Sequence, residues 1–359
     1  MKRRVFGMAE PSMLASSDSD IQGTIGIRHL ERLRSRLTAR PRPLAANDLD
    51  NHLDMRLLDT LGLGLEQALG YIAAAEPDLE QLEPWVLATA GLPDPLRVAR
   101  FNAVAEGAPY PNAVRRWLAS IDAMDDVLSP TDMEFWRVNG FVVLHDAVDL
   151  RDRDEAVEMI WRAVGGDPKK PETWYQNKTR HTMLQVFQDP ALPAIRRSAR
   201  VHKAFAQIWG TADLCMSTDR CGFSAPVREG EKSQSPAMHW DINFRHPERL
   251  QTQGILYLID THEEQGAFSV VPGFHHRLKD WLSILPDGAN PNVQDLEALG
   301  PHPIAGRAGD LIIWHGALPH GSRPNYHNQP RIVHYKNMYP ARFDADDGTS
   351  RRQSAETAS

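Results

Sequence analysis

An imidazole and a carboxylate stand two residues apart in the triplet His239-Trp240-Asp241. On an extended strand, residues i and i+2 face the same side, so both side chains can occupy adjacent positions around one metal ion. The chain has 15 His residues, so a triplet of this kind is expected by chance. His52-Leu53-Asp54 repeats the pattern within a helical stretch, where the two side chains diverge by roughly 200°. The first triplet is therefore a candidate metal site only together with a further ligand.

That further ligand is expected in the segment Trp314-His315-Gly316-Ala317-Leu318-Pro319-His320-Gly321-Ser322, which follows an expected strand. One of its histidines, with His239 and Asp241, would give two imidazoles and one carboxylate on one face of an iron, as in non-haem Fe(II) oxygenases. Zinc is the competing metal, although catalytic zinc usually takes three ligands in a tetrahedral site. The chain has no His-Glu-x-x-His motif, which weakens the zinc alternative.

Arg331 is the third candidate and lies 11 residues after His320. A symmetric hairpin centred on Asn325 and Tyr326 would place His320 and Arg331 opposite each other, with Cβ atoms roughly 5 Å apart. A guanidinium binds a carboxylate through two parallel hydrogen bonds. 2-Oxoglutarate chelates iron with one end and carries a carboxylate at the other, so it suits this pair. An ordinary surface arginine in a strand is the alternative.

These residues, with others, resemble those of a known family. From about Leu128 to Pro340 the sequence is similar to the phytanoyl-CoA dioxygenase family of Fe(II)/2-oxoglutarate oxygenases. Five segments match in the family's order, and in the third Phe274 replaces the usual Ser. They are Ser129 to Leu144, His239-Trp240-Asp241, Gln265 to His275, Ala308 to Leu311, and His320-Gly321-Ser322 with Asn325 and Arg331.

The resemblance implies a double-stranded β-helix, or jelly roll, braced by helices. It implies that His239, Asp241 and His320 bind Fe(II), and that Arg331 and Ser322 hold the distal carboxylate of 2-oxoglutarate. With O₂ as co-substrate, such a site hydroxylates or otherwise oxidises an unactivated C–H bond of a small molecule and releases succinate and CO₂. Related halogenases have a small residue in place of Asp241, so oxidation without chloride is expected here. His315 is expected to be structural.

Substrate contacts are expected from Trp240, Asn243, Arg245 and Phe223, because they lie close in sequence to the metal-site segments. Trp314 and Phe268 are also candidates for the pocket wall, with an ordinary core position as the alternative. Two other functions stay open. One is the same chemistry on a protein- or carrier-bound substrate, with the helical region as docking surface. The other is a non-redox metal-binding jelly roll, such as a zinc hydrolase.

Hydrophobic periodicity indicates the elements that position these residues. Helices are expected around 27–37, over 48–75 with a weak middle at Gly62 and Gly64, and over 79–90 and 113–124. Ser129-Pro130 begins a further helix, and Asn139-Gly140 ends it. Strands are expected at 141–144, 254–259, 268–271, 310–314 and 331–338, and helices at 153–164 and 193–209. Helices followed by closely spaced strands indicate an α+β fold.

Composition limits the classes of protein to which the chain can belong. The 359 residues include 40 Lys and Arg against 47 Asp and Glu, a formal net charge of −7 at pH 7. This argues against binding nucleic acid through bulk charge. Two cysteines cannot form a disulfide framework, and no stretch suits a membrane helix, so a cytoplasmic protein is expected. The expected layout is a mobile arm (1–46), a helical extension (47–127) that is a candidate homodimer interface, the jelly roll (128–344) and a disordered tail (345–359).

Overall fold

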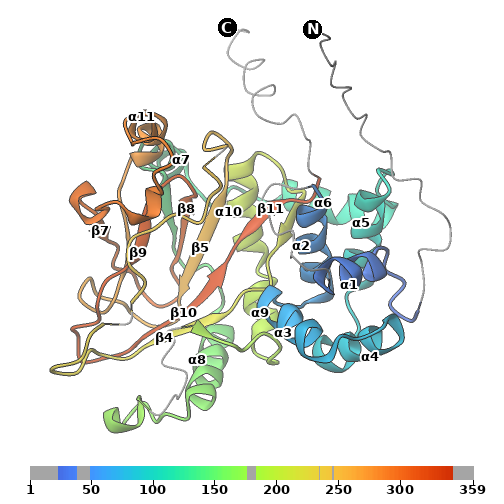
Figure 1. Ribbon diagram of the computed structural model, residues 1–359, viewed down its shortest axis with the longest axis horizontal. Coiled ribbons are helices and arrows are strands. Elements are labelled where there is room, and N and C mark those ends of the chain that lie inside the picture. The colour runs from blue at the N-terminus through green and yellow to red at the C-terminus, as the bar shows by residue number, and fades with distance from the viewer. Residues whose placement is uncertain (1–22, 39–48, 176–182, 234, 245, 343–359) are drawn as a thin grey trace, which may run out of the picture.

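The computed structural model describes residues 23–38, 49–175, 183–233, 235–244 and 246–342 (Figure 1). Its helical extension and its β-rich part lie side by side, with the helices α1 to α5 on the right of Figure 1 and the sheets on the left. Among the described residues, no helix combines the length and the apolar character that crossing a membrane requires. The predicted tail from 345 lies outside the described residues.

Within the described residues the extension has six helices, the first of them ahead of its expected start at 47. Apolar side chains from five of them share one core, with Leu33, Leu57, Ile72, Val86 and Phe101 among its buried members. The predicted mobile arm is wrong for residues 23–38, because Ile25, Ile27 and the apolar face of the first helix are buried in this core. The helices are α1 (Leu30–Thr38), α2 (Leu49–Leu61), α3 (Leu65–Ala75), α4 (Leu79–Ala90), α5 (Pro95–Ala105) and α6 (Asn112–Asp122).

Local sequence signals explain where several of these helices begin and end. Asp78 accepts a hydrogen bond from the Gln81 amide, and the Gln81 side chain accepts one from the Asp78 amide, which makes a capping box at α4. Gly62 has a φ of 73° between α2 and α3, a left-handed conformation that favours glycine. The expected helix over 48–75 is therefore two helices. Asp94 and Pro95 begin α5, which the sequence analysis did not predict.

The β-rich part opens as predicted with α7 (Pro130–Asn139), capped by Ser129 and ended by Gly140 at φ 75°, and continues into β1 (Phe141–Leu144). A six-stranded antiparallel sheet follows the order β1-β8-β5-β10-β4-β2, and a three-stranded sheet follows β7-β6-β9. These strands are β2 (Met183–Leu184), β4 (Cys221–Ser224), β5 (Thr252–Tyr257), β6 (Phe268–Val270), β7 (His302–Pro303), β8 (Leu311–His315), β9 (His320–Ser322) and β10 (Arg331–Lys336).

The large sheet separates two hydrophobic cores. Along β10, Val333 faces the interior with Tyr257 and Trp314, whereas its neighbour Ile332 faces a second core that includes side chains of α7 and of three later helices. Successive side chains in a strand point to opposite faces, which produces this division. The three helices are α8 (Leu150–Val164), α9 (Leu192–Arg196) and α10 (Ala199–Trp209). The fold is the expected mixture of helices and antiparallel sheets in a jelly-roll arrangement.

Two sequence expectations need correction. The predicted helix over 193–209 is interrupted, because Ser198 caps a new helix, α10. The predicted hairpin between His320 and Arg331 is wrong: β9 pairs with β6, whereas β10 pairs with β4 and β5. His320 and Arg331 therefore lie in different sheets. The remaining elements are β3 (Leu214–Met216) paired with β11 (Met338–Pro340), α11 (Leu278–Ser283), and four short 3₁₀ turns at Pro171–Thr173, Phe274–His276, Pro291–Val293 and Glu297–Leu299.

Candidate metal centre

Two backbone hydrogen bonds bring the two metal-site segments together. The His239 amide donates to the His320 carbonyl over 2.8 Å, and the His320 amide donates to the His239 carbonyl over 2.9 Å. This isolated bridge extends the small sheet beyond β9. The residue after His320 is Gly321, and a Cβ there would lie 3.0 Å from the Ala237 carbonyl oxygen. Glycine therefore permits the close approach of the two segments.

The bridge places His239, Asp241 and His320 as a triad. One candidate ligand atom of each residue lies within 4.8 Å of the others. Nε2 of His239 is 3.6 Å from one oxygen of Asp241, and Nε2 of His320 is 3.5 Å from the other. Each Nδ1 lies near a backbone carbonyl, at Ala237 (2.7 Å) and Leu318 (3.1 Å), so each Nε2 is turned toward the carboxylate. Two imidazole nitrogens and a carboxylate are a donor set that fits Fe(II).

Hydrogen bonding also holds the carboxylate of the triad in its charged form. Contacts from His239 and then His320 hold the pKa of Asp241 well below its usual range, and the same contact with Asp241 raises the pKa of His239. The Gln253 side chain donates to Asp241 over 2.8 Å and accepts from the indole of Trp314 over 3.0 Å. Asp241 is therefore an ionised, oriented ligand candidate, and Gln253 is a positioning residue that the sequence did not reveal.

A second positioning residue is Asn292. Its side-chain oxygen accepts from the Trp240 amide over 2.8 Å, and its nitrogen donates to the Trp240 carbonyl over 3.1 Å. The Trp240 indole is buried among Phe274 and Trp281 and donates to the Ala317 carbonyl over 2.9 Å. The ring therefore anchors the segment within the core, and the expected substrate contact of Trp240 stays a prediction.

The other expected substrate residues have different outcomes. Phe223 pairs with Ile332 and packs edge-on against Trp161 at 5.2 Å, on the helix-covered face of the large sheet. Arg331, the neighbour of Ile332, faces the opposite side, so the expected substrate contact of Phe223 is wrong. Asn243 follows the triad segment and is half-buried, and its substrate contact stays a prediction. Arg245 lies outside the described residues.

Arg331 is a buried cation, with 1% of its surface exposed. Its Nη1 donates to Ser322 Oγ and to the Gly266 carbonyl, each over 2.6 Å. Its Nε has no hydrogen-bond partner, and no carboxylate among the described residues forms an ion pair with it. A buried charge is costly unless it is paired. Arg331 and Ser322 are therefore a candidate anion site, and Ser322 shares a strand face with His320, two residues away.

Two other cations close to Arg331 in the sequence are engaged elsewhere. Arg323 donates to Glu297 over 2.7 Å. Lys336 points to the opposite face of the sheet, where its Nζ donates to the carbonyls of Ile195 and Arg196. His315 is structural as expected, because its Nδ1 accepts from the Ala317 amide over 3.0 Å.

A match to a family model assigns this chain to a known family. Residues 103–333 match the model of the family described as phytanoyl-CoA dioxygenase (PhyH). The chain belongs to this family. The match begins within α5, ahead of the expected boundary at 128. A Dictyostelium discoideum protein provisionally named as a phytanoyl-CoA dioxygenase is 23% identical over 259 residues, which cover 58% of this chain and 74% of that protein.

Similar solved structures are more distant. The epimerase SnoN, in complex with Fe³⁺, alpha-ketoglutarate and nogalamycin RO, is 15% identical, covers 62% of this chain and 84% of its own, and has a TM-score of 0.42. The non-heme monooxygenase ThoJ is 19% identical (58% and 76% covered, TM-score 0.43). EctD from S. alaskensis is 15% identical (60% and 78% covered, TM-score 0.43). At these scores the family assignment rests on the sequence match.

Family membership bears on the cofactors predicted from the sequence. Iron and 2-oxoglutarate are the cofactors of the phytanoyl-CoA dioxygenase family, and the triad supplies donors that suit the iron. Aromatic rings line one side of the triad: the His320 ring lies 5.1 Å from that of Trp314 and 6.0 Å from that of Phe268. Both rings belong to the interior core, as the sequence analysis allowed.

Proposed function

We propose that this chain is an Fe(II)- and 2-oxoglutarate-dependent dioxygenase that hydroxylates, or otherwise oxidises, an unactivated C–H bond of a small organic molecule. The observation that carries the proposal is the pairing of the His-Asp-His triad with Arg331, a buried guanidinium that pairs with no carboxylate of the described residues. A metal site alone would suit many functions. A metal site with an adjoining buried carboxylate receptor suits a keto acid that binds both.

The residues of the site would have two roles, metal binding and carboxylate binding. His239, Asp241 and His320 would hold Fe(II), and Arg331 with Ser322 would hold the distal carboxylate of 2-oxoglutarate. When bound with O₂, this pair supplies oxidation of a C–H bond, coupled to conversion of 2-oxoglutarate to succinate and CO₂. Asp241 fills the position that a halogenase leaves open, so chloride is not expected to take part. The protein fixes the geometry, and the burial of Arg331 excludes water from the carboxylate site.

Exposure of the triad indicates the side from which substrate would approach. The His320 side chain is 5% exposed, whereas those of His239 and Asp241 are 34% and 52% exposed. The rings of Trp314 and Phe268 cover the His320 side. The substrate would therefore reach the metal from the side of His239 and Asp241, close to the segment that contains Asn243.

The two alternative functions lose their supporting features. An exposed apolar face between Leu49 and Ile72 would favour a protein- or carrier-bound substrate, with the helical region as docking surface. Leu57, Leu61 and Ile72 are instead buried in the core of the extension. A zinc hydrolase would leave the buried charge of Arg331 without a role. We therefore retain the oxidation of a small molecule.

The test is an anaerobic titration of the apoprotein with Fe(II) and 2-oxoglutarate. A visible charge-transfer band of the iron–keto acid chelate is expected in the wild type and is expected to be absent in His239→Ala and Asp241→Ala. The exposed histidine variant His302→Ala is the matched control and should keep the band. Absence of the band in the wild type, with tight zinc binding in its place, would contradict the proposal.

A further inference from the structure

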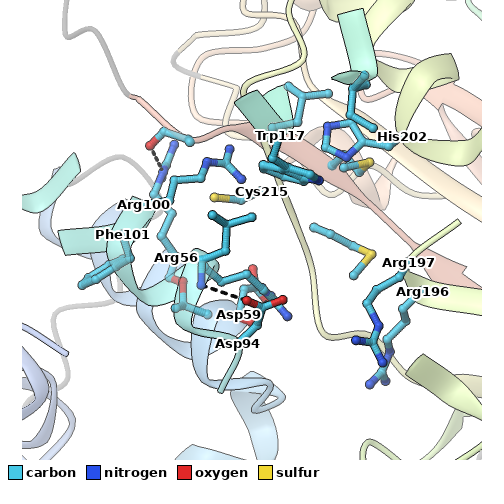
Figure 2. Close-up of a pocket in the computed structure, with 18 of the residues that line it drawn as sticks. Arg56, Asp59, Asp94, Arg100, Phe101, Trp117, Arg196, Arg197, His202 and Cys215 are labelled. Atoms are coloured by element: carbon cyan, nitrogen blue, oxygen red, sulfur yellow. Dashed lines mark hydrogen bonds between the residues drawn. The ribbon is translucent and has the colours of Figure 1, made fainter. Parts of the chain in front are cut away.

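A cavity lies between the helical extension and the jelly roll, with a volume of about 300 Å³ (Figure 2). Its wall on the extension side comes from α2, α5 and α6, and its wall on the other side comes from α9, α10, β3 and β11. None of the triad residues lines it, and neither does Arg331. This cavity is therefore separate from the candidate metal centre.

Five arginines line the cavity, and they come from both walls. Figure 2 shows Arg196 and Arg197 on one side and Arg56 and Arg100 on the other. The fifth is Arg97, in α5. A concentration of guanidinium groups around one cavity favours an anionic ligand, because each offers several fixed donors to carboxylate or phosphate oxygens.

Three of these arginines are held in place by neutral groups. Arg56 donates from Nε to the Ala341 carbonyl over 2.7 Å, and Arg97 donates to the Asp59 carbonyl. Arg196 donates to the carbonyls of Phe187 (2.6 Å) and Asp219 (2.8 Å), and its buried Nε has no hydrogen-bond partner. Within the described parts of the chain, none of the three forms an ion pair with a carboxylate. Carbonyls orient a guanidinium but do not neutralise its charge.

Nearby acids offset only part of this charge. Asp213 pairs with Arg100, with 2.8 Å between Oδ1 and Nη2. Asp94 is exposed and caps α5 by accepting from the Leu96 amide. Asp59 accepts from the Thr218 amide and from the Tyr339 hydroxyl, and burial raises its pKa to about 7. Asp219, beside Arg196, is half-buried, and desolvation raises its pKa as well. The cavity therefore keeps an excess of positive charge.

The rest of the lining is largely apolar. Phe101, Val104, Ile121 and Met338 contribute to it. The Trp117 ring lies between two polar neighbours, with the Arg100 guanidinium 5.4 Å from its centroid and the His202 ring edge-on at 5.4 Å. An anionic group would meet the arginines while an apolar or aromatic body would meet these side chains.

We propose that this cavity binds a small organic anion, a carboxylate or phosphate monoester carried on an apolar or aromatic body. The site does not depend on the metal centre. Such a ligand would connect α2 and α5 of the extension to α9 and α10 of the jelly roll, so its binding would raise the melting temperature of the whole chain.

The test is isothermal titration calorimetry on the full-length protein without metal, using phenyl phosphate, phenylacetate and uncharged phenol. One molecule of an anionic probe is expected to bind per chain, and phenol is expected to bind at least tenfold more weakly. The stronger of the two anions identifies the preferred head group. The same measurement on Arg331→Gln tests whether the probe binds at the 2-oxoglutarate site. The variant should bind the anionic probe with the affinity of the wild type, because Arg331 does not line the cavity.

Variants locate the binding within the cavity. The double variant Arg97→Gln with Arg197→Gln should weaken binding of the anion at least tenfold, and Ala199→Trp should weaken it by filling space at the exposed start of α10. Arg151→Gln, an exposed arginine on α8, is the matched control and should bind like the wild type. Circular dichroism checks that each variant is folded.

The outcomes separate the two proposals of function. The cavity proposal is overturned by no binding of either anion, by equal binding of phenol, by unchanged binding in both cavity variants, or by loss of binding in Arg331→Gln. Failure of the iron and 2-oxoglutarate titration leaves this result untouched, since the calorimetry uses neither component.

Discussion

The proposed binding of 2-oxoglutarate depends mainly on one residue, Arg331. Its guanidinium is buried and contacts Ser322 and the Gly266 carbonyl, both neutral groups. Gly266 adopts a φ of 70°, and a Cβ there would lie 3.2 Å from the Arg323 carbonyl oxygen. Glycine at this position therefore lets its carbonyl orient Arg331. These contacts fix the orientation of the guanidinium but do not neutralise its charge, so we expect a bound anion to do so.

The first prediction concerns this guanidinium. Arg331→Gln should weaken 2-oxoglutarate binding about 100-fold, because it removes charge-assisted hydrogen bonds that contribute roughly 1.5–3 kcal/mol each. Ser322→Ala should weaken it about tenfold or less, since the hydroxyl acts by orienting Arg331. Anaerobic titration of the iron-loaded protein measures both. Arg323→Gln, whose arginine pairs with Glu297, is the control and should bind normally. An unchanged affinity in Arg331→Gln would remove its assigned role.

The second prediction concerns Gln253. Gln253→Ala removes the hydrogen bond to Asp241 and also the acceptor of the Trp314 indole, so the carboxylate loses its fixed orientation. Metal affinity should fall about tenfold, as is typical when the partner of a ligand is lost. Titration with Mn(II) followed by electron paramagnetic resonance measures it. Gln294→Ala, on the neighbouring loop, should bind like the wild type, and equal affinities in the two variants would contradict the positioning role.

Residues of the candidate site differ in how far the sequence revealed them. His239, Asp241, His320 and Arg331 were predicted because their chemistry is distinctive and their order matches a family. Gln253 was not, because its contact with Trp314 depends on the pairing of β5 with β8, and no local signal marks that register. Asn292 acts from a loop 52 residues beyond Trp240. Phe223 was misplaced because the strand face to which it points is decided by the whole sheet.

At the scale of elements, ends were easier to predict than partners. Ser129-Pro130 and Asn139-Gly140 defined α7 correctly, since capping and breaking are local effects. The hairpin between His320 and Arg331 was wrong because proximity in sequence does not decide pairing when another strand can intervene. β6 pairs with β9, and β4 and β5 both pair with β10, which separates the expected partners. Arg331 still reaches Ser322, but through its side chain.

The contact of α2 with β11 gives a pH-dependent prediction. Burial raises the pKa of Asp59 to about 7. The folded protein therefore holds this proton more tightly than the unfolded chain does. The contribution of Asp59 to stability is full below about pH 4 and is lost as the pH rises through 7. The expected loss is on the order of 4 kcal/mol.

Asp59→Asn should remove this loss, because the amide stays neutral and can serve both Thr218 and Tyr339. Urea unfolding of wild type and variant at pH 4 to 8 should show a stability difference that changes with pH across this window. Asp94→Asn, at an exposed helix cap, should keep the pH profile of the wild type. Parallel profiles for wild type and Asp59→Asn would contradict the assignment.

At the scale of the whole molecule, the extension is joined to the jelly roll by polar contacts across a broad junction. Arg56 of α2 donates to the Ala341 carbonyl just beyond β11. Arg220 forms an ion pair of 2.8 Å with Glu66 of α3, and Gln188 bonds to Gln67. The two parts therefore stabilise each other. The proposed domain boundary near 128 marks a change in the sequence, and we do not expect the two parts to fold independently. A homodimer through the extension stays a prediction, which sedimentation can check.

A further link across this junction is the ion pair of Arg100 and Asp213, which Tyr110 completes by donating to Asp213 over 2.7 Å. Asp213→Ala would leave Arg100, whose side chain is 7% exposed, as an uncompensated buried charge. Removing one partner of such a pair costs about 3 kcal/mol or more. Urea unfolding should show this loss, whereas Glu134→Ala, in a surface pair with Arg137, should leave the free energy of unfolding nearly unchanged. Equal losses in the two variants would mean that the extension contributes little to the stability of the jelly roll.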